Sequence, residues 1–263
     1  MNAYKQLFKQ LVDNFEHSIT FVKRDIKYAR VDTKLGLFWV IFPPLVPLTV
    51  FIGLAALGII RRSADIPFVM YIVIGITLYR FMTQFITTTV NVFRTERNAL
   101  KNYNVPLIVL IVSQNAMTFF HLLLRLVLVA CVVLYYGVEA RIDWLLLPVV
   151  FIFMVMFSFG IGTILAFKNL LYRDYSKGLN LLVLYMMFVS SVIFPFPKDG
   201  IIGFINHFNP LNTYVDFTRS LFYHGVENSN YIVLCITAFI SFLLFLYACN
   251  LIYYSEKKVK MVL

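Results

Sequence analysis

The chain of 263 residues is 60% hydrophobic and only 14% charged, and it carries a formal net charge of +10. This composition is far more apolar than that of a soluble domain, so it excludes an ordinary soluble enzyme and predicts an integral membrane protein. The positive charge does not predict nucleic-acid binding, because the cations are spread over several segments between apolar stretches.

Six apolar stretches are each long enough to form a transmembrane helix. Crossing about 30 Å of hydrocarbon takes roughly 20 apolar residues. The stretches are Leu35–Ile60, Ile66–Val90, Pro106–Tyr136, Trp144–Phe167, Leu179–Phe196 and Tyr231–Tyr254. We therefore predict an all-α integral membrane protein with six transmembrane helices over residues 35–263, preceded by a separate segment of residues 1–34.

The segment of residues 1–34 has charges throughout and no span of its own. Within residues 3–30, apolar side chains recur every three or four positions, which places them on one face of a helix. They are Leu7, Leu11, Phe15, Ile19, Val22 and Ile26. A basic amphipathic helix ahead of a first span is typical of a helix lying in the cytoplasmic interface. Packing on the protein's own cytoplasmic side is the alternative.

The distribution of Lys and Arg predicts the orientation of the spans. If the N-terminus is cytoplasmic, the termini and connections on that side hold 16 of these residues, and the opposite side holds 5. Lys and Arg resist translocation, so we expect a multi-pass protein with both termini in the cytoplasm.

Two arginines fall inside predicted spans, Arg80 in the second and Arg125 in the third, and neither span contains an acidic residue. An intramembrane arginine costs at least about 2.5 kcal/mol on insertion scales, so it usually faces a bundle interior or water. Contact with polar or anionic cargo is one interpretation. The other is structural pairing with backbone carbonyls, or extension of Arg125 to the outer interface.

Aromatic residues cluster in two predicted spans. They are Phe38, Trp39 and Phe42 in the first span and Tyr185 and Phe188 in the fifth. Because aromatic faces stack on sugar rings, these side chains could line a path for a glycan. Ordinary packing or an interface belt is the commoner role of membrane aromatics.

The connection between the second and third spans, Phe93 to Val105, is short, charged and compatible with a helix through Lys101. Pro106 follows it, at a position where a proline can open the next helix. This connection is either a docking surface for a soluble partner or an ordinary solvated turn.

The outer connection from Pro195 to Tyr231 contains two apolar pieces too short to span, Ile201–Phe208 and Thr213–Tyr223, with a break at Asn209-Pro210. Half-length apolar helices around a break indicate a re-entrant hairpin, which is allowed where protein or a water-filled path covers the backbone. Two amphipathic helices lying flat on the outer surface are the alternative.

The sequence contains no motif of an enzyme active site. It has no phosphate-binding P-loop, no nucleophile elbow and no zinc-protease helix motif. Its four histidines and three cysteines are scattered over different elements. We therefore predict no catalytic residue, no cofactor and no metal site in this chain.

Four segments resemble the transmembrane subunit of type-2 ABC exporters of cell-surface polysaccharides, the family of O-antigen, capsule and teichoic acid permeases. Arg24 to Leu45 resembles the family's Arg-Asp-x-Lys…Leu-Gly-x-x-Trp…Pro-Leu signature. Gly75 to Phe81 is similar to its Gly-x-x-x-Trp-x-Phe-Phe, with Tyr79 in the Trp place. Asn98 to Pro106 resembles a stretch ending Phe-Pro, and Phe208 to Arg219 resembles Asn-Pro-[Leu/Met]…Arg.

The resemblance implies roles for three groups of residues. It implies an ATPase-coupling helix at about 94–103, an outer re-entrant gate at about 197–223, and a translocation path. The coupling residues are Arg94, Glu96, Arg97, Leu100, Lys101 and Tyr103; the gate residues are Asn209, Pro210, Leu211 and Phe217; the path residues are Phe38, Trp39, Phe42, Tyr79, Arg80, Arg125, Tyr185 and Phe188.

The resemblance also implies partners and a location. One six-span chain would be half of a transporter, so we expect a homodimer with two copies of a separate ATPase subunit, which would hold the ATP and Mg. The cargo would be a lipid-linked glycan crossing the cytoplasmic membrane of a bacterium. An ABC exporter of a drug or small lipid with the same architecture is the alternative.

Overall fold

The computed structural model describes residues 2–31, 46, 49–51, 53–54, 57–58, 66–102, 105–193, 203, 206, 209–223 and 231–262. All regular secondary structure in these ranges is helical. The α-helices are α1 (Asn2–Asp13), α2 (Phe15–Val31), α4 (Phe68–Thr95), α5 (Arg97–Asn102), α6 (Leu107–Tyr135), α7 (Leu147–Leu171), α8 (Asp174–Val189), α10 (Pro210–Tyr223) and α11 (Tyr231–Val262), and a 3-10 helix, Ile142–Leu146, precedes α7.

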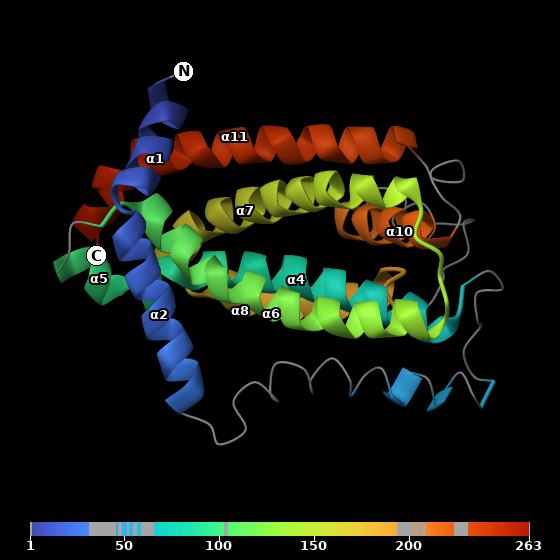
Figure 1. The fold of residues 1–263 in the computed structure, drawn as a ribbon. Helices are drawn as coiled ribbons and strands as arrows, with labels where there is room; N and C mark the ends of the chain where they lie inside the picture. The colour runs from blue at the N-terminus through green and yellow to red at the C-terminus, as the bar shows by residue number, and fades with distance from the viewer. Residues whose placement is uncertain are drawn as a thin grey trace.

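Four long helices, α4, α6, α7 and α11, run side by side along the molecule (Figure 1). Each forms all or most of a segment that is long and apolar enough to cross a membrane, and the segment of α7 also includes the preceding 3-10 helix. The segments are Phe68–Thr95, Leu107–Tyr135, Ile142–Leu171 and Tyr231–Glu256. They coincide with the second, third, fourth and sixth predicted spans, so the prediction of an all-helical membrane protein is confirmed.

The other two predicted spans stay predictions. The first, Leu35–Ile60, lies largely outside the described residues. The fifth, Leu179–Phe196, corresponds to α8, which has 16 residues, and its last three positions are also outside the described part of the chain. The count of six transmembrane helices therefore rests on the sequence.

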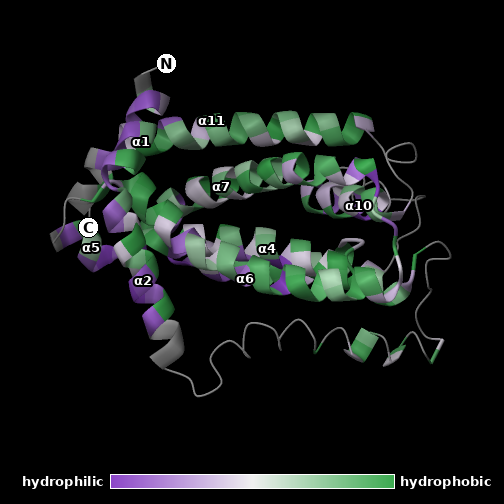
Figure 2. Cartoon of the chain, in the orientation of Figure 1, coloured by the Kyte–Doolittle hydropathy of each residue, from purple (hydrophilic) through white to green (hydrophobic). Residues whose placement is uncertain are grey.

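Helices α1 and α2 cross one end of the long helices, the end at which α5 and the C-terminus also lie (Figure 1). Figure 2 shows hydrophilic residues gathered at this end, whereas the long helices are mostly hydrophobic. Along the predicted apolar stripe Leu7 is buried, whereas Phe15 is 63% exposed, and a helix lying in the membrane interface stays a prediction. A turn at Asn14 separates the two helices, and the Tyr4 hydroxyl accepts a hydrogen bond from Asn250 of α11 at 3.0 Å.

Two glycines let α7 approach a neighbour on each side. A Cβ at Gly160 would lie 2.8 Å from the Cβ of Leu244 in α11, and a Cβ at Gly162 would lie 2.8 Å from the Cβ of Thr89 in α4. Small residues allow membrane helices to pack with their backbones close together. α7 therefore packs closely against both α4 and α11.

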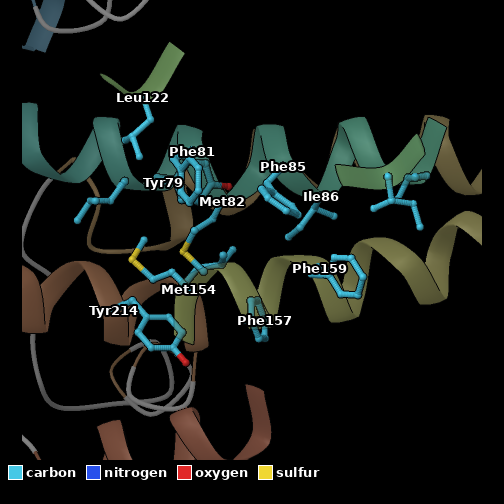
Figure 3. Close-up of a cluster of buried hydrophobic side chains, with 14 of the residues drawn as sticks. Tyr79, Phe81, Met82, Phe85, Ile86, Leu122, Met154, Phe157, Phe159 and Tyr214 are labelled. Carbon is cyan, nitrogen blue, oxygen red and sulfur yellow. The ribbon is translucent and has the colours of Figure 1, made fainter. Parts of the chain in front are cut away.

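Aromatic rings fill the space between α4, α6 and α7. Phe81 lies with its ring centroid 5.0 Å from that of Phe151 and 5.6 Å from that of Phe119. Figure 3 shows the side chains of α4 and α7 converging on this core, with Tyr214 of α10 beside Met154. Because Tyr214 is fully buried, α10 is part of the packed bundle.

Helix α10 lies beside α7 at the end of the bundle opposite α1 and α2 (Figure 1). Pro210 is its first residue, a position where proline needs no helical hydrogen bond. The Tyr214 hydroxyl forms a 2.6 Å hydrogen bond with Ser241 of α11. The first half of the predicted hairpin, Ile201–Phe208, lies mostly outside the described residues.

Candidate functional site

Helix α5 has one buried and one exposed face. Ala99 and Leu100 are buried, whereas Arg97 and Lys101 are exposed. Two of the predicted coupling residues thus lie on an outward, positively charged face, and Leu100 anchors the helix. Tyr103 lies outside the described residues.

Arg94 belongs to a polar junction between α4, α7 and α8. Its Nε donates a hydrogen bond to the carbonyl oxygen of Asn169 at 2.9 Å. The Asn169 side chain donates to the carbonyl of Val90 at 3.0 Å, and the Ser176 hydroxyl donates to Asn91 Oδ1 at 2.9 Å. Arg94 therefore joins helices at the end of the bundle that carries α5.

Glu96 points inward, where it joins α2 to the start of α5 and to α6. It is 5% exposed, and both its carboxylate oxygens accept hydrogen bonds from the Arg24 guanidinium, at 3.1 Å for Oε2. Gln114 Nε2 donates to Glu96 at 2.6 Å and to Asp25 at 3.0 Å. Burial raises the pKa of Asp25, with Arg24 opposing, and the hydrogen bond to Glu96 raises the pKa of Arg24.

Arg219 fastens α10 to the rest of the bundle. It is 3% exposed, and it donates to the carbonyl oxygens of Tyr71 at 2.8 Å, Ser191 at 2.7 Å and Val192 at 2.6 Å. It also pairs with Asp216 at 2.9 Å, and its guanidinium lies 3.5 Å from the Tyr71 ring centroid. One side chain therefore ties α10 to α4 and to the segment after α8.

The predicted gate residues surround the start of α10. Asn209 Oδ1 accepts a hydrogen bond from the backbone N–H of Leu211 at 3.1 Å, and its Nδ2 donates to the Ser190 hydroxyl at 3.0 Å. Leu211 and Phe217 are 9% and 6% exposed. The Asn209 side chain thus satisfies the backbone N–H of Leu211 next to the break at Asn209-Pro210.

Gln84 links Arg125 of α6 to α4, the helix that carries the other intramembrane arginine, Arg80. Arg125 Nη2 donates to Gln84 Oε1 at 3.2 Å, and Gln84 Nε2 donates to His121 Nδ1 at 2.8 Å. Across the described residues, Arg80 and Arg125 form no ion pair with a carboxylate, and Arg80 Nε, Arg125 Nε and Arg125 Nη1 have no hydrogen-bond partner. Two such arginines cost about 5–7 kcal/mol on insertion scales, so this cluster is costly to hold in a membrane.

A polar stripe continues from this cluster along α4. Arg80, Gln84, Thr87, Thr88 and Asn91 recur at spacings of three and four, and all five are half-buried. Of these residues, only Arg80 is among the predicted path residues. The polar residues have the same helical spacing, and that signal could have found the stripe.

The predicted aromatic path residues occupy different environments. Tyr79 is 2% exposed, and its hydroxyl donates to the carbonyl of Val183 in α8 at 2.6 Å, so it packs inside the protomer. Tyr185 and Phe188 of α8 are 66% and 45% exposed. Phe38, Trp39 and Phe42 lie outside the described residues. The role of these side chains in a path stays a prediction.

Nowhere in the described ranges do three or more His, Cys, Asp or Glu side chains gather as they would around a metal ion. Cys131 and Cys235 are exposed on α6 and α11, Cys249 is buried, and all three are free.

Comparison with known proteins identifies export permeases as relatives of this chain. The chain is 25% identical over 231 residues to an O-antigen export system permease protein RfbA of Klebsiella pneumoniae, covering 86% of this chain and 88% of that protein. A second RfbA of the same organism is 23% identical over 222 residues, covering 83% and 84%. The model of the ABC-2 type transporter family matches residues 17–223. The chain therefore belongs to the ABC-2 type transporter family.

Proposed function

We propose that this chain is the membrane subunit of an ATP-driven exporter that moves a lipid-linked surface polysaccharide across the cytoplasmic membrane of a bacterium. The observation that carries the proposal is the similarity to two O-antigen export permeases over more than four fifths of the chain. The family match over residues 17–223 supports it.

The proposed assembly contains two copies of this chain and two copies of an ATPase subunit, which would bind ATP and Mg. The exposed cations of α5, Arg97 and Lys101, support docking of the ATPase there, because charged groups at the rim of an interface steer and align a partner. In this arrangement α5 is at the cytoplasmic face, and both termini are cytoplasmic.

Coupling would pass from α5 to the bundle through Glu96. Its pairing with Arg24 and its hydrogen bond from Gln114 link the corner between α4 and α5 to α2 and α6. A push on α5 when ATP draws the ATPase subunits together would therefore move α2 and α6 with it. This gives residues 1–34 a gating role at the cytoplasmic interface.

The proposed path uses the polar stripe of α4 and is closed on the outside by α10. The half-buried Gln84, Thr87, Thr88 and Asn91 offer amide and hydroxyl groups to a polar cargo. α10, with its buried Leu211 and Phe217, would be the second half of a re-entrant gate. Non-spanning helices at membrane depth are tolerated where they cover a water-filled path.

The test is co-expression of the chain with a candidate ATPase subunit from the same organism, in a bacterial strain whose own polysaccharide export permease has been deleted. We expect the two proteins to co-purify and polysaccharide to return to the cell surface, and an ATPase variant unable to hydrolyse ATP should leave it inside. Absence of an ATPase partner, or transport without ATP, would show that the proposal is wrong. Drug resistance without surface polysaccharide would favour a drug or small-lipid exporter.

A further inference from the structure

The polar groups at the centre of α4 and α6 lie at one level of the bundle. The two helices are antiparallel (Figure 1). Arg80 lies one turn before Gln84, and Arg125 lies one turn after His121. The hydrogen bond between Gln84 and His121 therefore sets both arginines one turn nearer the α10 end. At about 1.5 Å per residue, Arg80 lies roughly 18 Å from the start of α4, and Arg125 lies roughly 15 Å from the end of α6.

These two arginines have more hydrogen-bond donors than the surrounding protein satisfies. Arg125 is 8% exposed, yet its Nε and Nη1 have no acceptor among the described residues, and neither has Nε of Arg80. Buried donors are normally paired, and two like charges at one level repel each other. A negatively charged ligand between them would satisfy the donors and remove the repulsion.

We infer that Arg80, Gln84, His121 and Arg125 form a binding site for a phosphate ester with two negative charges. Each guanidinium is a planar fork of donors that matches phosphate oxygens, and two such cations match a dianion. His121 Nδ1 accepts a hydrogen bond from Gln84, so its ring can offer an N–H at Nε2. The occupant rests on the proposed function: it is the phosphate end of the exported lipid-linked molecule.

The site opens toward the polar stripe of α4. Arg125 is buried at its back, whereas Arg80, Gln84 and His121 are half-buried. Gln84 belongs both to the site and to the stripe. A phosphate monoester of the exported molecule bound here would therefore lie at the start of the stripe.

The test measures ligand binding to the purified chain in detergent, without an ATPase subunit. The probes are lysophosphatidic acid, which has a phosphate monoester, the monoacylglycerol of the same acyl chain, and phosphatidylglycerol. The readouts are the dissociation constant by native mass spectrometry and the shift in unfolding temperature. We expect lysophosphatidic acid to bind and to raise the unfolding temperature, and the uncharged monoacylglycerol to do neither.

Arg80→Gln and Arg125→Gln should each weaken lysophosphatidic acid binding at least about tenfold. Arg80→Lys, which keeps the charge, should weaken it less. Arg141→Gln, at an exposed arginine outside the bundle, is the matched control and should bind as the unmodified chain does. The unfolding temperatures without ligand report whether each variant is folded, and removal of an intramembrane charge should not lower them.

Equal binding of lysophosphatidic acid and monoacylglycerol, or unchanged binding in both glutamine variants, would overturn the site. If phosphatidylglycerol binds as tightly as lysophosphatidic acid and the glutamine variants weaken both equally, the site binds an ordinary bilayer lipid. That result would overturn the cargo assignment. The binding experiment contains no ATPase subunit, so a negative binding result does not contradict the export proposal. Likewise, a negative export result does not contradict phosphate binding at this site.

Discussion

The guanidinium of Arg219 lies against the backbone of Gly75, in the space that any side chain at position 75 would fill. A Cβ there would lie 3.0 Å from Arg219 Cζ and closer still to its Nη2 and to the carbonyl oxygen of Val192. These atoms are fixed by the hydrogen bonds that join α10 to α4. The lack of a side chain at position 75 therefore allows α10 to pack closely against α4.

Gly75→Ala should destabilise the protein through this contact. Adding a methyl group to a closely packed interior typically costs about 1–3 kcal/mol, and here the neighbouring atoms are backbone and a multiply bonded guanidinium. The measurement is the free energy of unfolding in detergent micelles. Gly178→Ala is the control, since no atom lies within 4 Å of a Cβ at that position in α8.

A double-mutant cycle separates this contact from a general effect of alanine at position 75. In an Arg219→Ala background the side chain that collides with the new methyl group is absent, so Gly75→Ala should cost clearly less. The Arg219→Ala change itself should be costly, because it removes the buried hydrogen bonds that Arg219 donates to three carbonyl oxygens. Equal costs of Gly75→Ala in both backgrounds would contradict the proposed collision.

The pair formed by Arg24 and Glu96 should contribute measurably to stability even though one partner is near the surface. The two residues are 72 positions apart, Glu96 is buried, and the Arg24 side chain is 34% exposed. We expect a coupling energy of about 1 kcal/mol from Arg24→Ala, Glu96→Ala and the double variant. The exposed pair of Arg141 and Asp143, at 3.5 Å, is the control and should couple close to zero. If the coupling energy of Arg24 and Glu96 is no larger than that of Arg141 and Asp143, this ion pair does not hold α2 in place.

Hydropathy and proline placement were sufficient to locate the long helices. Pro106 precedes α6, the helix that we predicted through Lys101 is α5, and the apolar piece beginning at Thr213 belongs to α10. These features depend on local patterns, namely apolar content over about twenty residues and the missing donor of proline.

The partners of single polar residues could not be predicted in the same way. A glutamate in a charged connection is expected to face water, yet Glu96 turns inward because Arg24, far away in the sequence, meets it. Arg219 lies in the predicted outer connection, but it is buried because the carbonyl groups of Tyr71, Ser191 and Val192 converge on it. Such pairings are properties of the tertiary structure, and the sequence pattern around each residue does not contain them.

Reversing the charge of the exposed face of α5 should uncouple the ATPase from export. Arg97→Glu with Lys101→Glu places two negative charges where the proposed partner meets positive ones, so we expect its affinity to fall at least about tenfold. Lys5→Glu with Lys9→Glu makes the same charge change on exposed positions of α1 and should leave affinity unchanged. Co-purification and ATPase activity measure the outcome, and full activity with normal affinity in the α5 variant would remove the docking assignment.

The start and middle of α10 should be closed to water at rest and open during export. Leu211 and Phe217 are 9% and 6% exposed, and the hydrogen bonds of Asn209 and Arg219 hold α10 in this position. Single cysteines at Leu211 and Phe217, in a background without the three native cysteines, should react slowly with a membrane-impermeant thiol reagent added outside. Ala140→Cys, in the exposed connection after α6, is the control and should react quickly.

Adding ATP to the assembled exporter should raise the labelling of both gate cysteines, because a cargo can pass only if α10 moves away from the atoms that bury these side chains. The Ala140 control should keep its rate. Introducing Gly75→Ala should raise labelling even without ATP, since it weakens the packing of α10 against α4. Labelling of both cysteines at the control rate in the resting protein would mean that α10 is an open surface helix and that the gate assignment is wrong.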